Sequence, residues 1–209
     1  MNTVITIGRQ FGSGGREIGE KLASKFGIDF YDKELLQRAA KESGICKELF
    51  ENNDEKPTSS FLYNLVTDTY SFGFSSPYVE MPISHKVFLA QFDTIKKIAS
   101  EGPCVIVGRC ADYALSEFDN TLSVFINAPL EYKIARLKER LPDIKDEEKL
   151  EDMIVKTDKS RASYYNYYSS KKWGRASTYD LCINSSVLGI DGTVDYIKEF
   201  VDRYNNNRD

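Results

Sequence analysis

A glycine-rich turn between a short apolar run and a helical pattern is the feature that most constrains this chain. Residues 4–7 (Val-Ile-Thr-Ile) are typical of a buried strand, and residues 16–26 follow a helical pattern. Between them stands Gly-Arg-Gln-Phe-Gly-Ser-Gly-Gly, with four glycines in eight residues. Because glycine loses more conformational entropy on folding than other residues, this density indicates a required backbone shape. A strand, a glycine-rich turn and a helix N-terminus together form the usual phosphate cradle of a parallel α/β protein.

The turn departs from the common phosphate-loop pattern G-x-x-x-x-G-K-[ST]. In the alignment that ends on Gly15, Gln10 replaces the first glycine, Arg16 the lysine and Glu17 the hydroxyl residue. We expect the turn to bind the phosphates of a nucleotide, with Arg16 as a bidentate cationic clamp. The residues of this predicted cofactor site are Gly12, Ser13, Gly14, Gly15, Arg16 and Glu17. The alternative is a tight turn without a ligand.

Glu17 has two interpretations that the sequence leaves open. Its carboxylate could hold Mg²⁺ directly, in place of the missing hydroxyl. It could equally be a favourable anion at a helix N-terminus, with no metal.

The rest of the chain alternates between short apolar runs and helical patterns. Strands are expected over 4–7, 28–31, 104–107, 122–127 and 180–184. Helices are expected over 16–26, 33–43, 85–100, 130–140, 147–168 and 194–204, the last with Thr193 as its N-cap. Such alternation predicts an α/β fold, with a parallel sheet covered by helices on both faces.

Two long connections interrupt this pattern. About seventy residues separate the second and third strands, too many for a bare loop, and the stretch 52–84 within them is loop-like. Its segment 61–78 carries six aromatic residues. They would form either the small core of an inserted subdomain or a homodimer contact, since aromatic residues are enriched in interface cores. The second connection, from about 141 to 179, starts with charged residues and ends in a segment rich in Tyr, Lys and Arg.

Composition excludes several classes of protein. The chain of 209 residues has a formal net charge of −4, so nucleic acid is not expected as a partner. It lacks the ~18 consecutive apolar residues of a membrane span. The four cysteines form no C-x-x-C pair, which favours a reduced, cytoplasmic protein without structural zinc, and Cys104 and Cys182 are expected to be buried thiols. The single histidine, His85, argues against a histidine-based metal site or triad.

Two further candidate sites follow predicted strands. Asp32 stands just past the second strand, where open α/β sheets bind ligands, and Arg38 lies about two helical turns further on. Gly108 and Arg109 directly follow the third strand, so Arg109 is expected to point into the same crevice. The alternatives are helix capping for Asp32, a solvated helix face for Arg38, and a structural ion pair for Arg109.

A third group of candidates lies on the later helices. Arg136 and Arg140 share one predicted helix, and Asp158 and Arg161 are neighbours on one face of the next. A mobile segment that carries arginines can close over a transferring phosphoryl group and exclude water. The alternative is a surface helix with an ordinary ion pair.

Taken together, these residues resemble the cytidylate kinase-like family within the P-loop nucleoside monophosphate kinases, over nearly the whole chain. The matching features are the opening turn, Asp32 six residues before Arg38, Gly108-Arg109, and Asp158 three residues before Arg161. The resemblance implies a P-loop NTPase-type three-layer α/β/α fold with sheet order 2-3-1-4-5. It implies one kinase-like domain, with a core over 1–50 and 85–140, an acceptor-side insertion over 51–84, a helical lid over 141–178, and the last strand and helix over 179–209.

The resemblance also implies roles for individual residues. Arg16, Arg109 and Arg161 would be catalytic. Asp32, Arg38, Arg109, Asp158 and Arg161 would bind the acceptor substrate, with ATP or another nucleoside triphosphate as donor and Mg²⁺ as the accompanying ion. The predicted activity is transfer of the γ-phosphoryl group to a small acceptor, such as CMP or dCMP. The competing hypothesis is a nucleotide-binding module without catalysis, motivated by the departures at Gln10, Arg16 and Glu17.

Overall fold

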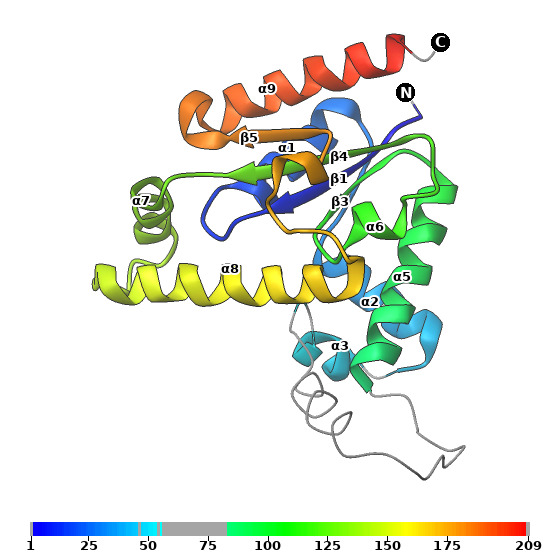
Figure 1. The fold of residues 1–209 in the computed structure, drawn as a ribbon, viewed down its shortest axis with the longest axis horizontal. Coiled ribbons are helices and arrows are strands. Elements are labelled where there is room, and N and C mark those ends of the chain that lie inside the picture. The colour runs from blue at the N-terminus through cyan, green and yellow to red at the C-terminus, as the bar shows by residue number, and fades with distance from the viewer. Residues whose placement is uncertain (1, 46, 54, 56–82, 208–209) are drawn as a thin grey trace.

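The fold is a parallel sheet between two layers of helices (Figure 1). A computed structural model describes residues 2–45, 47–53, 55 and 83–207. The strands are β1 (Val4–Arg9), β2 (Asp29–Tyr31), β3 (Cys104–Val107), β4 (Thr121–Asn127) and β5 (Leu181–Asn184). The helices are α1 (Gly15–Phe26), α2 (Lys33–Ser43), α3 (Lys47–Asn53), α5 (Ile83–Glu101), α6 (Ala111–Ala114), α7 (Leu130–Arg140), α8 (Glu147–Ser169) and α9 (Ser185–Asn206), with a 3₁₀ turn, η1, over Ala176–Thr178.

The sheet has the order β2-β3-β1-β4-β5, and neighbouring strands are parallel, which confirms the predicted topology. The central strand β1 pairs with β3 on one side and β4 on the other. Its register places Ile7 beside Val107 and beside Val124. The carboxyl ends of the three central strands therefore meet at one edge, where this kind of sheet binds its ligands.

Each face of the sheet buries its own apolar cluster. On one face, α1 and α9 pack against strand residues such as Ile5 and Leu122. On the other, α2, α5 and α6 cover Val4 and Ile106. The strands are apolar on both faces because both faces are covered, as in other parallel sheets.

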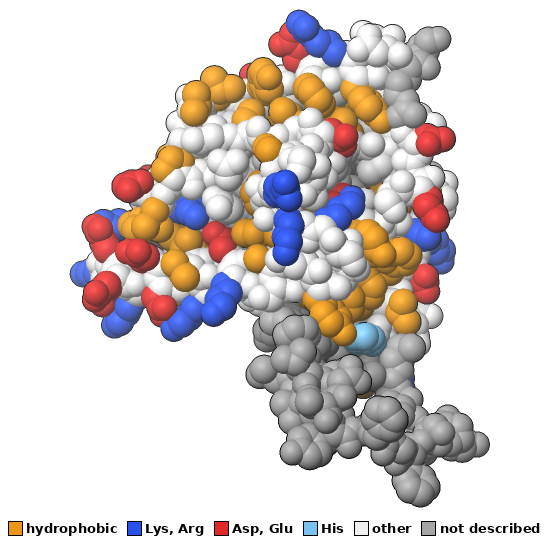
Figure 2. Space-filling view, in the orientation of Figure 1, with side chains coloured by type: hydrophobic (Ala, Val, Ile, Leu, Met, Phe, Trp, Pro, Cys, Tyr) orange, Lys and Arg blue, Asp and Glu red, His pale blue; other side chains and the backbone are white. Residues whose placement is uncertain are grey.

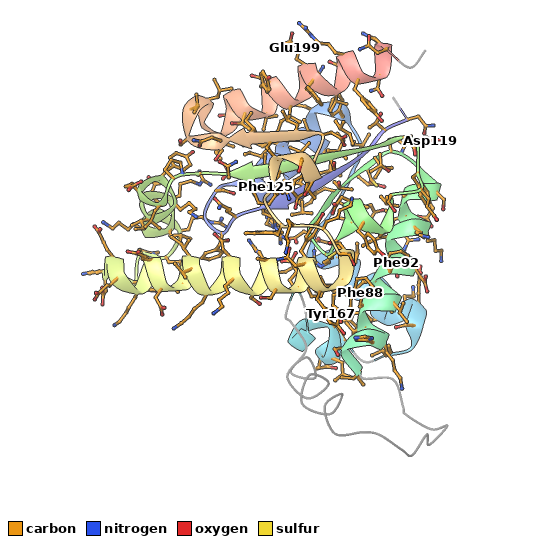
Figure 3. The ribbon with its side chains drawn as sticks, viewed as in Figure 1. Phe88, Phe92, Asp119, Phe125, Tyr167 and Glu199 are labelled. Carbon is orange, nitrogen blue, oxygen red and sulfur yellow. The ribbon has the colours of Figure 1, made fainter. Side chains whose placement is uncertain are left out.

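The long helix α8 crosses below the sheet and meets α5 at its far end (Figure 1). Aromatic side chains make this junction: Figure 3 shows Phe88 and Phe92 of α5 close to Tyr167 of α8. The ring of Phe88 stacks on that of Tyr168, with 3.9 Å between centroids. His85, in the first turn of α5, contacts the Tyr167 hydroxyl at 3.0 Å. These contacts fix the orientation of α8 relative to the sheet.

Three helix predictions differ from the structure. The helices α3 and α6 were not expected, because they are too short for a clear helical period. The last helix begins at Ser185 rather than Val194, and Asn184 is its N-cap. A break at Gly189, with φ 66° and ψ −175°, hides this first part from a periodicity analysis. Thr193 is therefore not the N-cap; it is a buried residue inside the helix, and its hydroxyl donates to the Gly189 carbonyl.

Other predictions concern thiols, membranes and the insertion. Cys104 is buried, which raises its pKa to about 12, whereas Cys182 is only half-buried. No helix in the described part of the chain is long and apolar enough to cross a membrane. The aromatic segment 61–78, with its predicted subdomain core or dimer contact, lies outside the described residues.

Candidate functional site

The glycine-rich turn has the special backbone shape that the sequence predicts. Gly12 and Gly14 have φ of 80° and 82°, in the left-handed region that favours glycine, and α1 begins directly after them at Gly15. The hydroxyl of Ser13 is buried and donates to the carbonyls of Gln10 and Ile126, at 2.8 and 3.2 Å. Ser13 therefore holds the turn against β4 with its side chain.

Gly15 is required for a different reason. Its backbone is helical, but a Cβ atom built on it would lie 2.5 Å from the Cβ of Arg9. The loop thus ends at Gly14, and the Arg9 side chain occupies the space beside residue 15. This favours an alignment of the phosphate-loop pattern one residue earlier than the sequence suggested, with Arg9 in place of its first glycine and Gly15 in place of its lysine.

Asp32 bridges two of the predicted arginines. Its carboxylate accepts from Arg16 Nε at 2.9 Å and from Arg109 Nη1 at 3.0 Å. Asp32 stands at the N-cap position of α2, yet its side chain makes no capping hydrogen bond. Burial alone would raise the pKa of this carboxyl, but the charge and hydrogen bond of Arg109, together with Arg9 and Arg16, outweigh burial and keep the pKa below its usual value. Asp32 is therefore an ionised counter-charge inside the site.

A second carboxylate, Glu55, joins two further arginines of the site. It accepts from Arg9 Nη1 at 2.5 Å, from Arg161 Nε at 3.2 Å and from the backbone N–H of Arg109 at 3.0 Å. Burial would raise the pKa of the Glu55 carboxyl, but the charges of Arg9 and Arg161 hold it well below its usual range. Arg161 comes from α8 and Arg109 follows β3, so the predicted catalytic arginines do meet at the end of the sheet.

These residues line a cleft of about 430 Å³ in front of the turn. Six basic side chains face two carboxylates in its wall, so the cleft is basic within an acidic chain. Its volume falls in the range of small-molecule sites. The lining residues are Arg9, Gln10, Phe11, Gly12, Gly14, Gly15, Arg16, Asp32, Lys33, Glu55, Arg109, Arg140 and Arg161. The backbone N–H groups at a helix N-terminus and the basic side chains of the cleft are suited to binding the phosphates of a nucleotide.

Asp158 lies beside this cleft and holds the turn in place. Its carboxylate accepts from the backbone N–H of Phe11 at 2.6 Å and from the ammonium of Lys133 at 3.3 Å. Gln10 adds to this network, because its side-chain oxygen accepts from Ala128 N–H at 3.2 Å. The turn is thereby tied to both α7 and α8.

Two predicted site residues face elsewhere. The guanidinium of Arg38 pairs with both carboxylate oxygens of Glu101 and with Glu42, at the contact between α2 and α5. Glu17 accepts from Arg136 Nη2 at 2.7 Å. No group of three or more His, Cys, Asp or Glu side chains that could hold a metal ion is present among the described residues. Glu17 thus forms an ion pair between α1 and α7, and its role as a Mg²⁺ ligand stays a prediction.

Arg9 and Glu55 are the site residues that the sequence analysis missed. Arg9 could have been found: Ile7-Gly8-Arg9 at the end of β1 repeats the pattern of Val107-Gly108-Arg109 at the end of β3, and Ile7 pairs with Val107. Two Gly-Arg pairs in register on neighbouring strands predict two arginines at one edge. Glu55 has no such signal, because it follows α3 in a stretch without periodicity.

Comparisons with known proteins give the family and the fold of this chain. The cytidylate kinase of Pyrococcus horikoshii is 26% identical over 200 residues, which cover 95% of this chain and 88% of that protein. The crystal structure of an uncharacterized protein from Eubacterium ventriosum is 32% identical, with a TM-score of 0.71, and the match covers 96% of this chain and 98% of that one. Shikimate kinase from Bacteroides thetaiotaomicron, 17% identical with a TM-score of 0.55 over 97% of this chain and 99% of that one, shares the fold. The sequence profile of the Cytidylate kinase-like family matches residues 4–187, so this chain belongs to the Cytidylate kinase-like family.

Proposed function

We propose that this protein is a phosphotransferase that moves the γ-phosphoryl group of a nucleoside triphosphate to a small acceptor, with a nucleoside monophosphate such as CMP or dCMP as the preferred acceptor. Membership of a kinase-like family supports a nucleotide kinase in general. The observation that carries the proposal is the meeting of Arg109 and Arg161, from two distant segments, with Arg9 in a cleft in front of the glycine-rich turn.

In the proposed reaction, an acceptor oxygen attacks the γ-phosphorus of the triphosphate. One P–O bond forms to the acceptor, the bond between the γ-phosphorus and the β–γ bridging oxygen breaks, and a nucleoside diphosphate leaves. Such transfer depends on positioning and on neutralising the charge of the moving group. Guanidinium groups that pair with Asp32 and Glu55 at the cleft provide that charge.

The proposed site keeps most of the residues predicted from the sequence. The backbone of Gly12 to Gly15 and the N-terminus of α1 would hold the donor phosphates, and Arg16, Arg109 and Arg161 would surround the moving group. Asp32 would face the acceptor, and Asp158 would act on the turn through Phe11. Arg38 and Glu17 are left out because their partners lie outside the cleft. The donor would bring Mg²⁺ bound to its phosphates, and a cytoplasmic location is part of the same proposal.

A non-catalytic nucleotide-binding module is the second candidate. The observation that favours it is the replacement of the loop lysine, by Arg16 or, in the alignment that the structure favours, by Gly15. This candidate predicts nucleotide binding without a labelled product.

A transfer assay separates the two candidates. Labelled ATP or GTP is incubated with Mg²⁺ and a panel of nucleoside monophosphates, and the labelled diphosphate is measured. We expect product with CMP or dCMP, and a loss of at least about a hundredfold in kcat/KM for Arg161→Ala, because one charged contact in a transition state is worth roughly 3 kcal/mol.

The matched control is Arg203→Ala, since Arg203 pairs with Glu199 on the exposed surface of α9. It should retain the activity of the unmodified protein. Absence of product together with measurable triphosphate binding would contradict the kinase proposal and favour the binding module.

A further inference from the structure

The carboxylate of Glu55 makes contacts that a bound phosphoryl group would make. Three donors reach its two oxygens: the guanidinium groups of Arg9 and Arg161 and the backbone N–H of Arg109. Guanidinium and backbone N–H groups are also the common ligands of phosphate in proteins. The donors come from three segments that are distant in the sequence: β1, the turn after β3, and α8. An anion binding here would hold all three together.

The Arg9 side chain is a fixed part of this donor set. It is 10% exposed, at the end of the central strand. It fills the space beside Gly15, where any side chain at that position would collide with it. The loop therefore has no side chain at residue 15, because the Cβ and Cγ of Arg9 take that space, while the Arg9 guanidinium lies beside Gly108 and Glu55.

Besides these ionic contacts, Glu55 makes one further hydrogen bond with the described residues. Its backbone carbonyl accepts from Ser160 Oγ at 3.1 Å, and its carboxylate lies in the wall of the cleft that contains the turn. A carboxylate carries one negative charge, whereas a phosphoryl group carries up to two and has three oxygens that accept hydrogen bonds. The same three donors would therefore favour a phosphoryl group that reaches them.

We infer that Arg9, Arg161 and the Arg109 amide form an anion subsite for a nucleotide phosphoryl group, and that Glu55 occupies this subsite as an internal anion which the ligand displaces. The inference rests on the proposed function only for the class of ligand. Arg9 is then a phosphate-binding residue, and Glu55 sets the affinity by competing for the subsite. The alternative is that Glu55 is a permanent counter-ion and that ligands bind only at the turn.

The test is equilibrium binding of inorganic pyrophosphate, measured by titration calorimetry without any turnover. Glu55→Gln keeps the shape of the side chain and removes its charge. If the Glu55 carboxylate fills the subsite about nine-tenths of the time in the unmodified protein, pyrophosphate should bind about tenfold more tightly to Glu55→Gln. Arg9→Gln should bind about tenfold more weakly, because it loses one charge-assisted hydrogen bond. The control variant is Glu199→Gln. Glu199 pairs with Arg203 on α9, and Figure 3 shows it well away from α8. The affinity of this variant for pyrophosphate should equal that of the unmodified protein.

Several results would overturn the inference. Unchanged or weaker binding in Glu55→Gln would make Glu55 a structural counter-ion, and unchanged binding in Arg9→Gln would place the anion elsewhere. Absence of binding both to the unmodified protein and to Glu55→Gln would remove the subsite. If Glu55→Gln does not fold, as judged by circular dichroism, Glu55→Asp replaces it: the charge stays but the side chain is one methylene shorter, so binding should tighten by a smaller factor.

Titrations with ATP and with CMP assign the subsite to the donor or to the acceptor. The affinity of the nucleotide that uses the subsite should change in both Glu55→Gln and Arg9→Gln. If the affinity of neither nucleotide changes, the inference is wrong. Because these measurements need no product, failure of the transfer assay and failure of the subsite remain distinguishable.

Discussion

The arginines of the cleft are paired with carboxylates in a repeating arrangement. Asp32 lies between Arg16 and Arg109, and Glu55 lies between Arg9 and Arg161. Each carboxylate fixes two guanidinium groups that would otherwise repel each other. The sequence revealed three of these four arginines: Arg16 from the phosphate-loop pattern, Arg109 from its place after a strand, and Arg161 from its spacing to Asp158. It could not reveal their pairing, which depends on contacts between segments far apart in the chain.

The pairing of Asp32 makes stability depend on pH. Its native pKa is lower than the usual value of about 3.9. The unfolded state therefore takes up the proton first as the pH falls, and the contribution of Asp32 to stability is complete above about pH 4 and is lost below it. Asp32→Asn should cost about 3 kcal/mol at pH 7, because it removes the charge that pairs with the buried guanidinium of Arg109.

Urea unfolding between pH 3 and pH 7 measures both effects. The free energy of unfolding of the unmodified protein should fall more steeply toward pH 3 than that of Asp32→Asn, so the two curves converge in acid. Parallel curves would mean that Asp32 is not held ionised by its arginines.

At the scale of elements, the sequence predicted what depends on local periodicity. Five strands and most helices are where the apolar patterns place them, since a strand buried on both faces reads as a continuous apolar run. The patterns missed α3 and α6, which are short, and the start of α9, which a break at Gly189 separates from the rest. The site also depends on how α7 and α8 pack on the turn. Lys133 of α7 and Asp158 of α8 form an ion pair where these helices pack, and no local sequence pattern predicts this pair.

Asp158 is expected to act as a clamp between α8 and the glycine-rich turn. Burial raises the pKa of its carboxyl above the usual value, against the opposing effects of the Phe11 N–H and Lys133. Its main contact, the hydrogen bond from Phe11 N–H, needs an acceptor oxygen but no charge. Asp158→Asn can keep this acceptor, whereas Asp158→Ala removes it.

Amide hydrogen exchange at Phe11 should separate these two variants. We expect protection of this amide to fall about tenfold in Asp158→Ala, which corresponds to the loss of one hydrogen bond of about 1.5 kcal/mol, and to be largely retained in Asp158→Asn. Equal exchange in both variants would show that the charge, rather than the hydrogen bond, holds the turn. Equal protection in all three proteins would show that Asp158 is no clamp.

At the scale of the whole molecule, a basic cleft lies in a chain of net charge −4. Figure 2 shows acidic and basic side chains interspersed near the exposed end of α8, whereas hydrophobic ones gather over α9. A small anion can enter the cleft, where six basic side chains outnumber two carboxylates. A long polyanion would also meet the acidic side chains around it, and this disfavours binding.

Thermal unfolding with two kinds of ligand tests this selectivity. ATP at a hundred times its dissociation constant should stabilise the fold by about 2.7 kcal/mol, because it binds only the native state. For a chain of this length that is a rise in Tm of roughly 5–10 °C. A twenty-nucleotide RNA at the same phosphate concentration should leave Tm unchanged. An equal rise in Tm with RNA would show that the cleft is part of a nucleic-acid-binding surface. If Arg161→Ala shows the same rise in Tm with ATP as the unmodified protein, ATP binds away from the arginines on which the proposed chemistry depends.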